Sequence, residues 1–127
     1  MNIFGIGTDI VSVDRIKKSL KNKKFLKRVF NTQEILKCKK NINPYNCYSK
    51  RFAAKEAFSK ALGTGISNGI SFNEIIILNK KSGKPYITLS GQTKRIIERK
   101  FKRKKIKISL SLSDEAKYAV AFVTISI

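Results

Sequence analysis

The sequence predicts an α+β fold in one domain, residues 1–127, whose N-terminal helical half packs on a C-terminal, mainly antiparallel sheet. Two patterns carry this prediction. Apolar residues recur at helical spacing between Tyr45 and Leu62, whereas apolar and polar residues alternate strictly from Ile106 to Ser113. A chain of 127 residues with 42% hydrophobic side chains can bury one modest core.

The first residues predict a strand that leads into a helix. The segment Asn2–Val11 contains Gly5 and Gly7, which indicate a bulge or the close approach of another backbone. Ser12 is expected to cap a helix that buries Ile16 on its apolar face.

Two short helical segments and a linker follow. Residues 25–30 carry a short apolar face, and Asn31–Glu34 has the spacing of a capping box that starts another helix. Residues 39–46 are polar, include Pro44 and predict a linker.

The long helix, Tyr45–Leu62, is predicted to be amphipathic, and Gly63 and Gly65 are expected to end it. Its small apolar face is expected to pack against a sheet or another helix. That face consists of Ala53, Ala54, Ala57, Phe58, Ala61 and Leu62. The opposite, mostly charged face consists of Arg51, Phe52, Lys55, Glu56, Ser59 and Lys60.

The C-terminal half reads as strands with one helix between them. Residues 75–78 and 85–89 predict two strands joined by a hairpin turn over residues 79–84. Ser90 is expected to cap a basic helix that runs to about Phe101. The last segment, Tyr118–Ile127, is apolar on both faces, which predicts a central strand.

Composition limits the possible functions. A net charge of +20 favours a polyanionic partner such as nucleic acid, anionic lipid or an acidic protein. Because the chain has no histidine, it has no Ser-His-Asp triad and no histidine metal site. Cys38 and Cys47 cannot complete a zinc site and are expected to be reduced thiols. No apolar run reaches a membrane span of roughly 20 residues, and no signal peptide is evident, so we expect a cytoplasmic protein.

Two carboxylates stand in unusual surroundings. Asp9 lies in a predicted strand, where an acid needs a partner, and Glu56 lies among lysines next to a glycine-rich helix end. Together they indicate a divalent cation shared with a polyphosphate. Simpler explanations remain: an i,i+4 ion pair from Glu56 to Lys60, an Asp9 that binds backbone N–H groups, and a Gly63–Gly65 segment that only stops a helix.

Six segments together resemble the holo-acyl-carrier-protein synthase family, the small bacterial 4′-phosphopantetheinyl transferases. The resemblance covers nearly the whole chain, and the helix segment is highly specific. The matching segments are Gly5–Val11, Arg15-Ile16, Arg51–Gly65, Gly83–Tyr86 and Leu110–Asp114 followed by Tyr118–Ala121.

The resemblance implies the phosphopantetheinyl transferase fold and a reaction. The enzyme would move 4′-phosphopantetheine from coenzyme A to a serine of apo-acyl carrier protein in fatty acid biosynthesis, releasing adenosine 3′,5′-bisphosphate. Asp9 and Glu56 would bind Mg²⁺ and, with Lys60, would form the catalytic group. Either a water in the metal's shell or Glu56 would take the serine proton. The residues implied in coenzyme A binding are Arg51, Lys55, Lys60, Gly63, Thr64, Gly65, Gly83, Lys84, Pro85 and Asp114.

The resemblance also implies partners. Many family members have histidine where this chain has Asp114, so Asp114 is expected to act through the metal shell or a bound water. The family is typically a homotrimer with active sites at subunit interfaces, and the basic face of its first helix docks the acidic carrier protein. The docking candidates are Arg15, Lys18, Lys21, Lys24 and Arg28.

Two other functions compete with this one. A nucleic-acid-binding module would interleave aromatic and basic residues, but the phenylalanines fall mostly on apolar faces, so we expect no nucleic-acid partner and no membrane partner. A relative acting on carrier domains of polyketide or peptide synthetases is disfavoured by the shortness of the chain.

Overall fold

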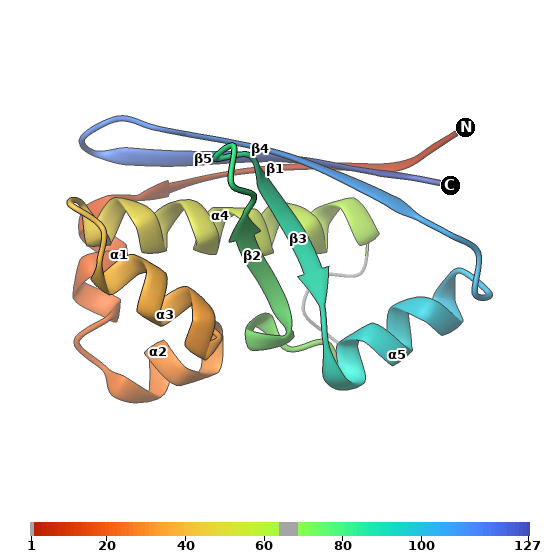
Figure 1. The fold of residues 1–127 in the computed structure, drawn as a ribbon, viewed down its shortest axis with the longest axis horizontal. Helices are drawn as coiled ribbons and strands as arrows, with labels where there is room; N and C mark the ends of the chain where they lie inside the picture. The colour runs from red at the N-terminus through yellow and green to blue at the C-terminus, as the bar shows by residue number, and fades with distance from the viewer. Residues whose placement is uncertain (1, 64–68) are drawn as a thin grey trace.

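The computed structural model describes residues 2–63 and 69–127; the predicted site residues Thr64 and Gly65 lie outside these ranges. Helices and strands follow the predicted order, and Figure 1 shows their arrangement. The N-terminal elements are β1 (Ile3–Ser12), α1 (Val13–Ser19), α2 (Lys23–Val29), α3 (Thr32–Lys39) and α4 (Pro44–Leu62). The C-terminal elements are η1 (Phe72–Glu74), β2 (Ile75–Asn79), β3 (Pro85–Leu89), α5 (Gly91–Lys100), β4 (Lys107–Asp114) and β5 (Tyr118–Ser126).

The strands form two antiparallel sheets rather than one C-terminal sheet. The larger has the order β1-β5-β4, so β5 is central as its apolar character on both faces predicts. The N-terminal strand β1 belongs to this sheet, with Asp9 opposite Ala121. The smaller sheet is the β2–β3 hairpin, and Gly83 in its turn has a φ of 92°, which suits glycine. Pairing between the two chain ends is a long-range contact that local patterns do not reveal.

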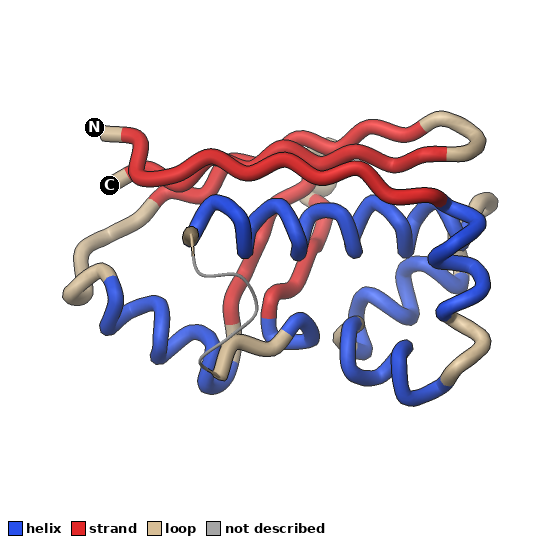
Figure 2. Tube along the Cα trace, turned by 180° about the vertical axis from the view of Figure 1, so that it is seen from behind, coloured by secondary structure: helices blue, strands red, loops and turns tan. Residues whose placement is uncertain are grey.

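Helix α4 lies along the inner face of the larger sheet and forms the centre of the core. Figure 1 shows α1, α2 and α3 gathered near one end of α4 and α5 near the other, while Figure 2 shows the same layers from behind. Ala57 and Phe58 are fully buried, as are Ala119, Ala121 and Val123 of β5. The predicted small apolar face of α4 is confirmed.

Gly5 and Gly7 allow β1 to lie against the α4 backbone. A Cβ atom built on Gly5 would collide with the carbonyl oxygen of Ala61, and one on Gly7 would collide with that of Ala57. The β1–β5 register also shifts between Ile3 and Gly5. Both predicted roles of the glycines, a bulge and a close approach, are therefore confirmed. The close approach holds Asp9 beside α4.

The predicted polar face of α4 is only partly a surface. Arg51, Lys55 and Ser59 are 4%, 0% and 2% exposed, and Phe52 is half-buried. Much of this charged face is buried because α4 is covered twice, by the sheet on one side and by α3 and β2 on another. Helical periodicity identifies the more apolar face but not a second packing layer.

The two cysteines are joined in a disulfide, so the prediction of reduced thiols was wrong. Cys38 lies at the C-terminal end of α3, and Cys47 lies in the first turn of α4. Their Cα atoms are 5.4 Å apart. The short turn between the helices folds α3 back on α4, and this places two otherwise unrelated thiols within bonding geometry.

The outer face of the larger sheet, which points away from α4, is apolar and uncovered. Ile6 and Ile10 of β1 are 56% and 65% exposed, and Val120 and Phe122 of β5 are also exposed. Ile10 pairs with Val120 in the sheet, so these side chains form one continuous patch. We call these four residues the outer-sheet patch. Among the described residues, no helix is long and apolar enough to cross a membrane.

Candidate functional site

Three of the predicted catalytic side chains lie together where β1 crosses α4. The Lys60 Nζ donates to Asp9 Oδ1 at 3.2 Å and to the Thr8 carbonyl at 3.0 Å. Glu56 stands one helical turn before Lys60 on α4 and is half-buried. We call Asp9, Glu56 and Lys60 the carboxylate cluster.

The carboxylate cluster concentrates negative charge around Glu56. Burial raises the pKa of Glu56 above its ordinary value, and the Asp9 carboxylate raises it further. Lys60 and Arg15 oppose this shift through their positive charges. Two carboxylates that repel each other in a partly desolvated place are typical of a functional site.

Neither simpler explanation of the two acids is found among the described residues. Lys60 forms its salt bridge with Asp9 and not with Glu56. The hydrogen bond that Asp9 accepts comes from the Lys60 side chain and not from backbone N–H groups. The recorded partner of Asp9 is therefore Lys60, in an ion pair that joins β1 to α4.

The cluster fits a magnesium ion by the chemistry of its donors. Mg²⁺ prefers oxygen ligands, keeps several waters and is usually bound through one or two carboxylates together with phosphate oxygens. The structure supplies two carboxylates, Asp9 and Glu56, whose mutual repulsion a divalent cation would relieve. The described residues contain no group of three or more acidic, histidine or cysteine side chains that would hold a metal without a substrate.

A second part of the predicted site lies at the β2–β3 hairpin. Arg51 donates to Asn79 Oδ1 at 2.7 Å, and Asn79 in turn donates to the Gly83 carbonyl at 3.0 Å. Lys84 is exposed in the same turn, and Pro85 begins β3. We call Arg51, Asn79, Gly83 and Lys84 the hairpin cluster. Arg51 fixes the hairpin turn to α4 and keeps a buried Nε atom without a partner among the described residues.

The carboxylate cluster and the hairpin cluster lie on opposite faces of α4. Arg51 and Lys60 are nine residues apart, which is about two and a half helical turns. One protomer therefore does not bring the two halves of the predicted site together. Gly63 ends α4 with a φ of 80°, as predicted, just beyond the carboxylate cluster.

Lys55 does not lie where a coenzyme A phosphate could reach it. Its ammonium group is fully buried and donates to Glu34 Oε1 at 2.7 Å and to the carbonyls of Phe72 and Ile75 at 2.8 and 2.7 Å. Burial lowers the pKa of Lys55 to about 8, and the nearby Glu34 opposes that shift. Lys55 is a structural anchor, and its burial argues against the coenzyme A contact that the resemblance implies.

Asp114 lies at the end of β4, beside the start of α4. Asn46 donates to its Oδ2 at 2.9 Å, and Lys50 lies 3.4 Å from its Oδ1. Both partners come from the first turns of α4, several residues before the carboxylate cluster. The structure thus gives Asp114 a cationic and an amide partner, neither of which the sequence analysis identified.

The basic residues proposed for docking lie on two helices and not on one. Arg15 and Lys18 belong to α1, Lys21 follows it, and Lys24 and Arg28 belong to α2. Asn22 interrupts the segment by capping α2, so the expected single helical face was wrong. Arg15 is close enough to the carboxylate cluster to influence Glu56, which puts one end of this surface beside the site.

Glu34 and Asn79 were missed as site-building residues. Glu34 was identified only through the capping box, which the structure confirms, but its other oxygen also accepts from the Ile77 backbone N–H at 3.1 Å. Nothing in the local sequence marks Asn79 as the partner of Arg51, because the contact joins residues 28 positions apart.

Comparison with known proteins identifies the family of this chain. The profile described as 4′-phosphopantetheinyl transferase superfamily matches residues 5–123. A holo-[acyl-carrier-protein] synthase from Pelagibacter ubique is 52% identical over 123 residues, covering 97% of this chain and 96% of its own. A synthase of the same name from Vibrio campbellii is 43% identical and covers 97% of each chain.

Solved structures of similarly named proteins share the fold. The crystal structure of holo-[acyl-carrier-protein] synthase from Neisseria meningitidis has a TM-score of 0.87 and 39% identity, covering 99% of this chain and all of that one. The Helicobacter pylori synthase in complex with coenzyme A has a TM-score of 0.79 and 39% identity, covering 95% and 99% of the two chains.

The chain therefore belongs to the 4′-phosphopantetheinyl transferase superfamily. It is an enzyme of the phosphopantetheinyl transferase class, and the predicted α+β fold is confirmed.

Proposed function

We propose that this enzyme transfers the 4′-phosphopantetheine group of coenzyme A to a serine of apo-acyl carrier protein, with Mg²⁺, in fatty acid biosynthesis. The observation that carries the proposal is the carboxylate cluster, in which Asp9, Glu56 and Lys60 meet where β1 crosses α4. Support comes from relatives named for this reaction and from a relative solved with coenzyme A.

The proposed reaction forms one bond and breaks one bond at phosphorus. The serine oxygen attacks the phosphorus that carries the pantetheine arm, and the bond from that phosphorus to the bridging oxygen of the pyrophosphate breaks. Adenosine 3′,5′-bisphosphate leaves with the bridging oxygen. The Glu56 carboxylate, which lies in the carboxylate cluster, is the proposed acceptor of the serine proton.

Mg²⁺ would be held by Asp9 and Glu56 and, when bound, would neutralise charge that develops on the phosphate oxygens. Lys60 orients Asp9 through its hydrogen bond, donates a second to the Thr8 carbonyl, and keeps one N–H donor for a phosphate oxygen. Lys84 of the hairpin cluster is an exposed cation suited to the nucleotide phosphates.

A direct assay tests this function. The enzyme, coenzyme A and Mg²⁺ are incubated with apo-acyl carrier protein, and mass spectrometry detects the addition of one phosphopantetheine group. A peptide-synthetase carrier domain assayed in parallel measures carrier specificity. Modification of the synthetase domain alone would contradict the proposed partner, and modification of neither would contradict the reaction.

We propose that the active enzyme is a homotrimer whose active sites lie between protomers. The two halves of the predicted site lie on opposite faces of α4, so a carboxylate cluster of one protomer needs the hairpin cluster of another. The outer-sheet patch supplies an uncovered apolar surface that a second copy would bury.

The trimer is expected to dissociate when the outer-sheet patch is charged. Sedimentation equilibrium of the unmodified protein is expected to give about three times the protomer mass. Ile10→Glu combined with Phe122→Glu places two carboxylates in the patch and is expected to give monomers with little activity. Ile42→Glu is the matched control, because Ile42 is 94% exposed outside the patch. A fully active monomer would contradict shared active sites.

The α1–α2 surface is expected to bind the acidic carrier protein and not coenzyme A. Lys18→Glu combined with Lys21→Glu should raise the KM for the carrier protein roughly tenfold, because exposed charges mainly steer association. The KM for coenzyme A should change much less. Added salt should reproduce the effect in the unmodified enzyme, since screening acts within about 8–10 Å.

The control for this prediction is Lys37→Glu combined with Lys39→Glu, two exposed lysines of α3 outside the proposed docking surface. Equal changes in both KM values, or no change in either, would contradict the division of the basic surface.

A cytoplasmic location is also part of the proposal. The Cys38–Cys47 bond argues against it, because disulfides are rare in reducing compartments. Rapid alkylation of thiols in intact cells, followed by mass spectrometry, decides between a reducing, cytoplasmic location and an oxidising one. Two alkylated cysteines agree with a cytoplasmic protein, whereas an unmodified pair contradicts it.

A further inference from the structure

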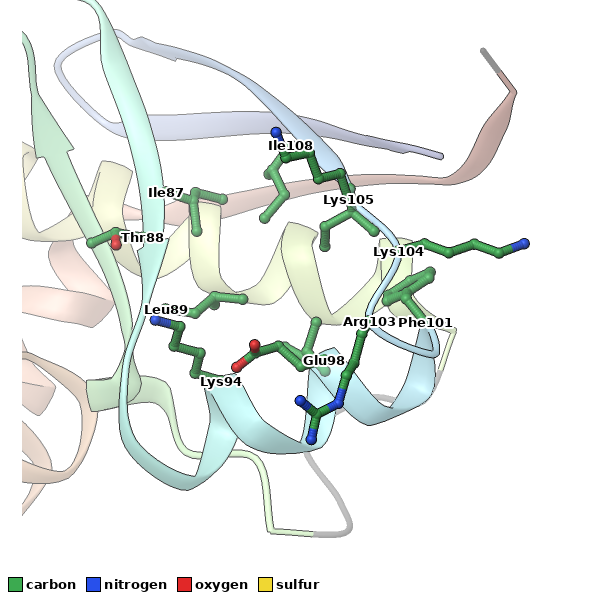
Figure 3. Close-up of a pocket in the computed structure, with 12 residues that line it drawn as sticks. Ile87, Thr88, Leu89, Lys94, Glu98, Phe101, Arg103, Lys104, Lys105 and Ile108 are labelled. Carbon is green, nitrogen blue, oxygen red and sulfur yellow. The ribbon is translucent and has the colours of Figure 1, made fainter.

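A cavity of about 380 Å³ lies between β3, α5 and β4, apart from both clusters of the proposed active site. Figure 3 shows the side chains that line it. None of its lining residues belongs to the carboxylate cluster, the hairpin cluster or the outer-sheet patch. Its size falls in the range of small-molecule sites, about 300–1,000 Å³.

The floor of this cavity is apolar and contributed by three elements. Ile87 and Leu89 of β3 and Ile108 of β4 are half-buried, as is Ile106 just before β4, while Phe101 beyond α5 is buried. Figure 3 shows Ile87, Leu89 and Ile108 reaching into the same space. Because Ile108 is on the inner face of its strand, this apolar surface lies on the other side of the sheet from the outer-sheet patch. Trimer formation through that patch would not cover it.

The mouth of the cavity is strongly basic. Lys94, Arg103, Lys104 and Lys105 line it together with one acid, Glu98. In Figure 3, Lys94 and Arg103 stand on the two sides of Glu98, whereas Lys104 extends away from the cavity. None of these five residues takes part in a salt bridge in the part of the chain that the structure describes.

The backbone after α5 is held in an uncommon conformation that forms this mouth. Lys102 and Arg103 have φ values of 52° and 61°, a left-handed region that non-glycine residues seldom occupy. The two residues turn the chain from the end of α5 toward β4 and place Arg103 over the cavity. This conformation is common where a helix ends, and the Arg103 N–H donates to the Glu98 carbonyl at 2.8 Å.

We propose that this cavity binds a single-chain amphipathic anion, with its hydrocarbon chain on the apolar floor and its carboxylate or phosphate head group at Lys94 and Arg103. The floor offers an acyl chain a place out of water, and the surplus of cations at the mouth favours an anionic head group. A nucleotide would leave its polar edges unpaired against the isoleucines. This proposal does not depend on the proposed transferase reaction.

The experiment is displacement of a fluorescent fatty acid from the full-length protein by unlabelled ligands below their micelle concentrations. Across hexanoate, octanoate and decanoate, affinity is expected to rise about fourfold for each added methylene until the cavity is filled. This is the gain in affinity expected from burying one methylene group. Decyl phosphate compared with decanoate decides between the two head groups. Decanol and decyltrimethylammonium should bind at least about tenfold more weakly, and salt should weaken the anions.

Two variants locate the site. Lys94→Glu combined with Arg103→Glu should lower decanoate affinity at least about tenfold, while Lys37→Glu combined with Lys39→Glu, the matched control, should leave it unchanged. Leu89→Trp should fill the floor and shorten the preferred chain, with circular dichroism checking its folding. If Leu89→Trp does not fold, the charge variant alone decides.

Other results would overturn the proposal. One is an affinity for the carboxylates that does not depend on their chain length. Another is equal affinity for decyltrimethylammonium and decanoate. A third is an equal loss of decanoate affinity in the control variant, Lys37→Glu combined with Lys39→Glu. Binding only to vesicles of anionic phospholipid would show a membrane-binding surface in place of a cavity ligand and would also overturn it.

Discussion

Glu56→Gln is expected to lower the transfer rate by about 10²–10⁴-fold while the protein stays folded, because it removes both a metal ligand and the proposed proton acceptor. Asp9→Asn is expected to have an effect of similar size through the metal. Both changes preserve side-chain shape, so the packing of β1 against α4 is kept. Initial rates with saturating coenzyme A, carrier protein and Mg²⁺ measure the effect.

Stability distinguishes loss of chemistry from loss of folding in this prediction. Without Mg²⁺, the raised pKa of Glu56 means that the unfolded state loses its proton first as pH rises above the ordinary value of 4.5. Ionised Glu56 therefore lowers the free energy of unfolding at neutral pH, and Glu56→Gln is expected to keep or raise it.

Glu115→Gln is the matched control, since Glu115 is an exposed acid in the β4–β5 turn. Its turnover should equal that of the unmodified enzyme. Near-normal turnover in Glu56→Gln or Asp9→Asn would remove that residue from the catalytic site, and an unchanged Mg²⁺ affinity would remove it from the metal site.

Lys55→Met is expected to lower the free energy of unfolding by about 3–5 kcal/mol, because it leaves the buried Glu34 carboxylate without its cation. The carbonyls of Phe72 and Ile75 would lose their donor as well. Methionine fills a similar volume, so the loss measures the ion pair and its hydrogen bonds more than a cavity. Urea unfolding monitored by circular dichroism measures the change.

Lys18→Met is the matched control for this substitution. Lys18 pairs with Asp14 four residues earlier, and both side chains are more than 70% exposed, at 73% and 72%. The same change there should alter the free energy of unfolding by less than about 0.5 kcal/mol. Equal effects at Lys55 and Lys18 would show that the buried pair does not anchor α4.

The sequence alone predicted the order of the main helices and strands and singled out the two acids of the carboxylate cluster. Ser12, Asn31 and Gly63 mark helix ends because capping and left-handed geometry are local properties. The alternation of apolar and polar residues in β4 and the apolar character of β5 are properties of the local sequence. They therefore predict strands whatever elements pack against them. Asp9 and Glu56 stood out because acids are uncommon in such segments, and the structure brings both to one place.

Only the tertiary structure decided which charged residues are buried and which contacts join distant segments. Lys55 and Arg51 follow the same helical pattern as Lys60, yet α3 and β2 cover the first two and leave the third exposed. The Cys38–Cys47 bond, the Arg51–Asn79 contact and the pairing of β1 with β5 depend on how the chain folds back on itself. Local sequence encodes helix, strand and cap through interactions within a few residues, whereas burial depends on neighbours that are far away along the chain.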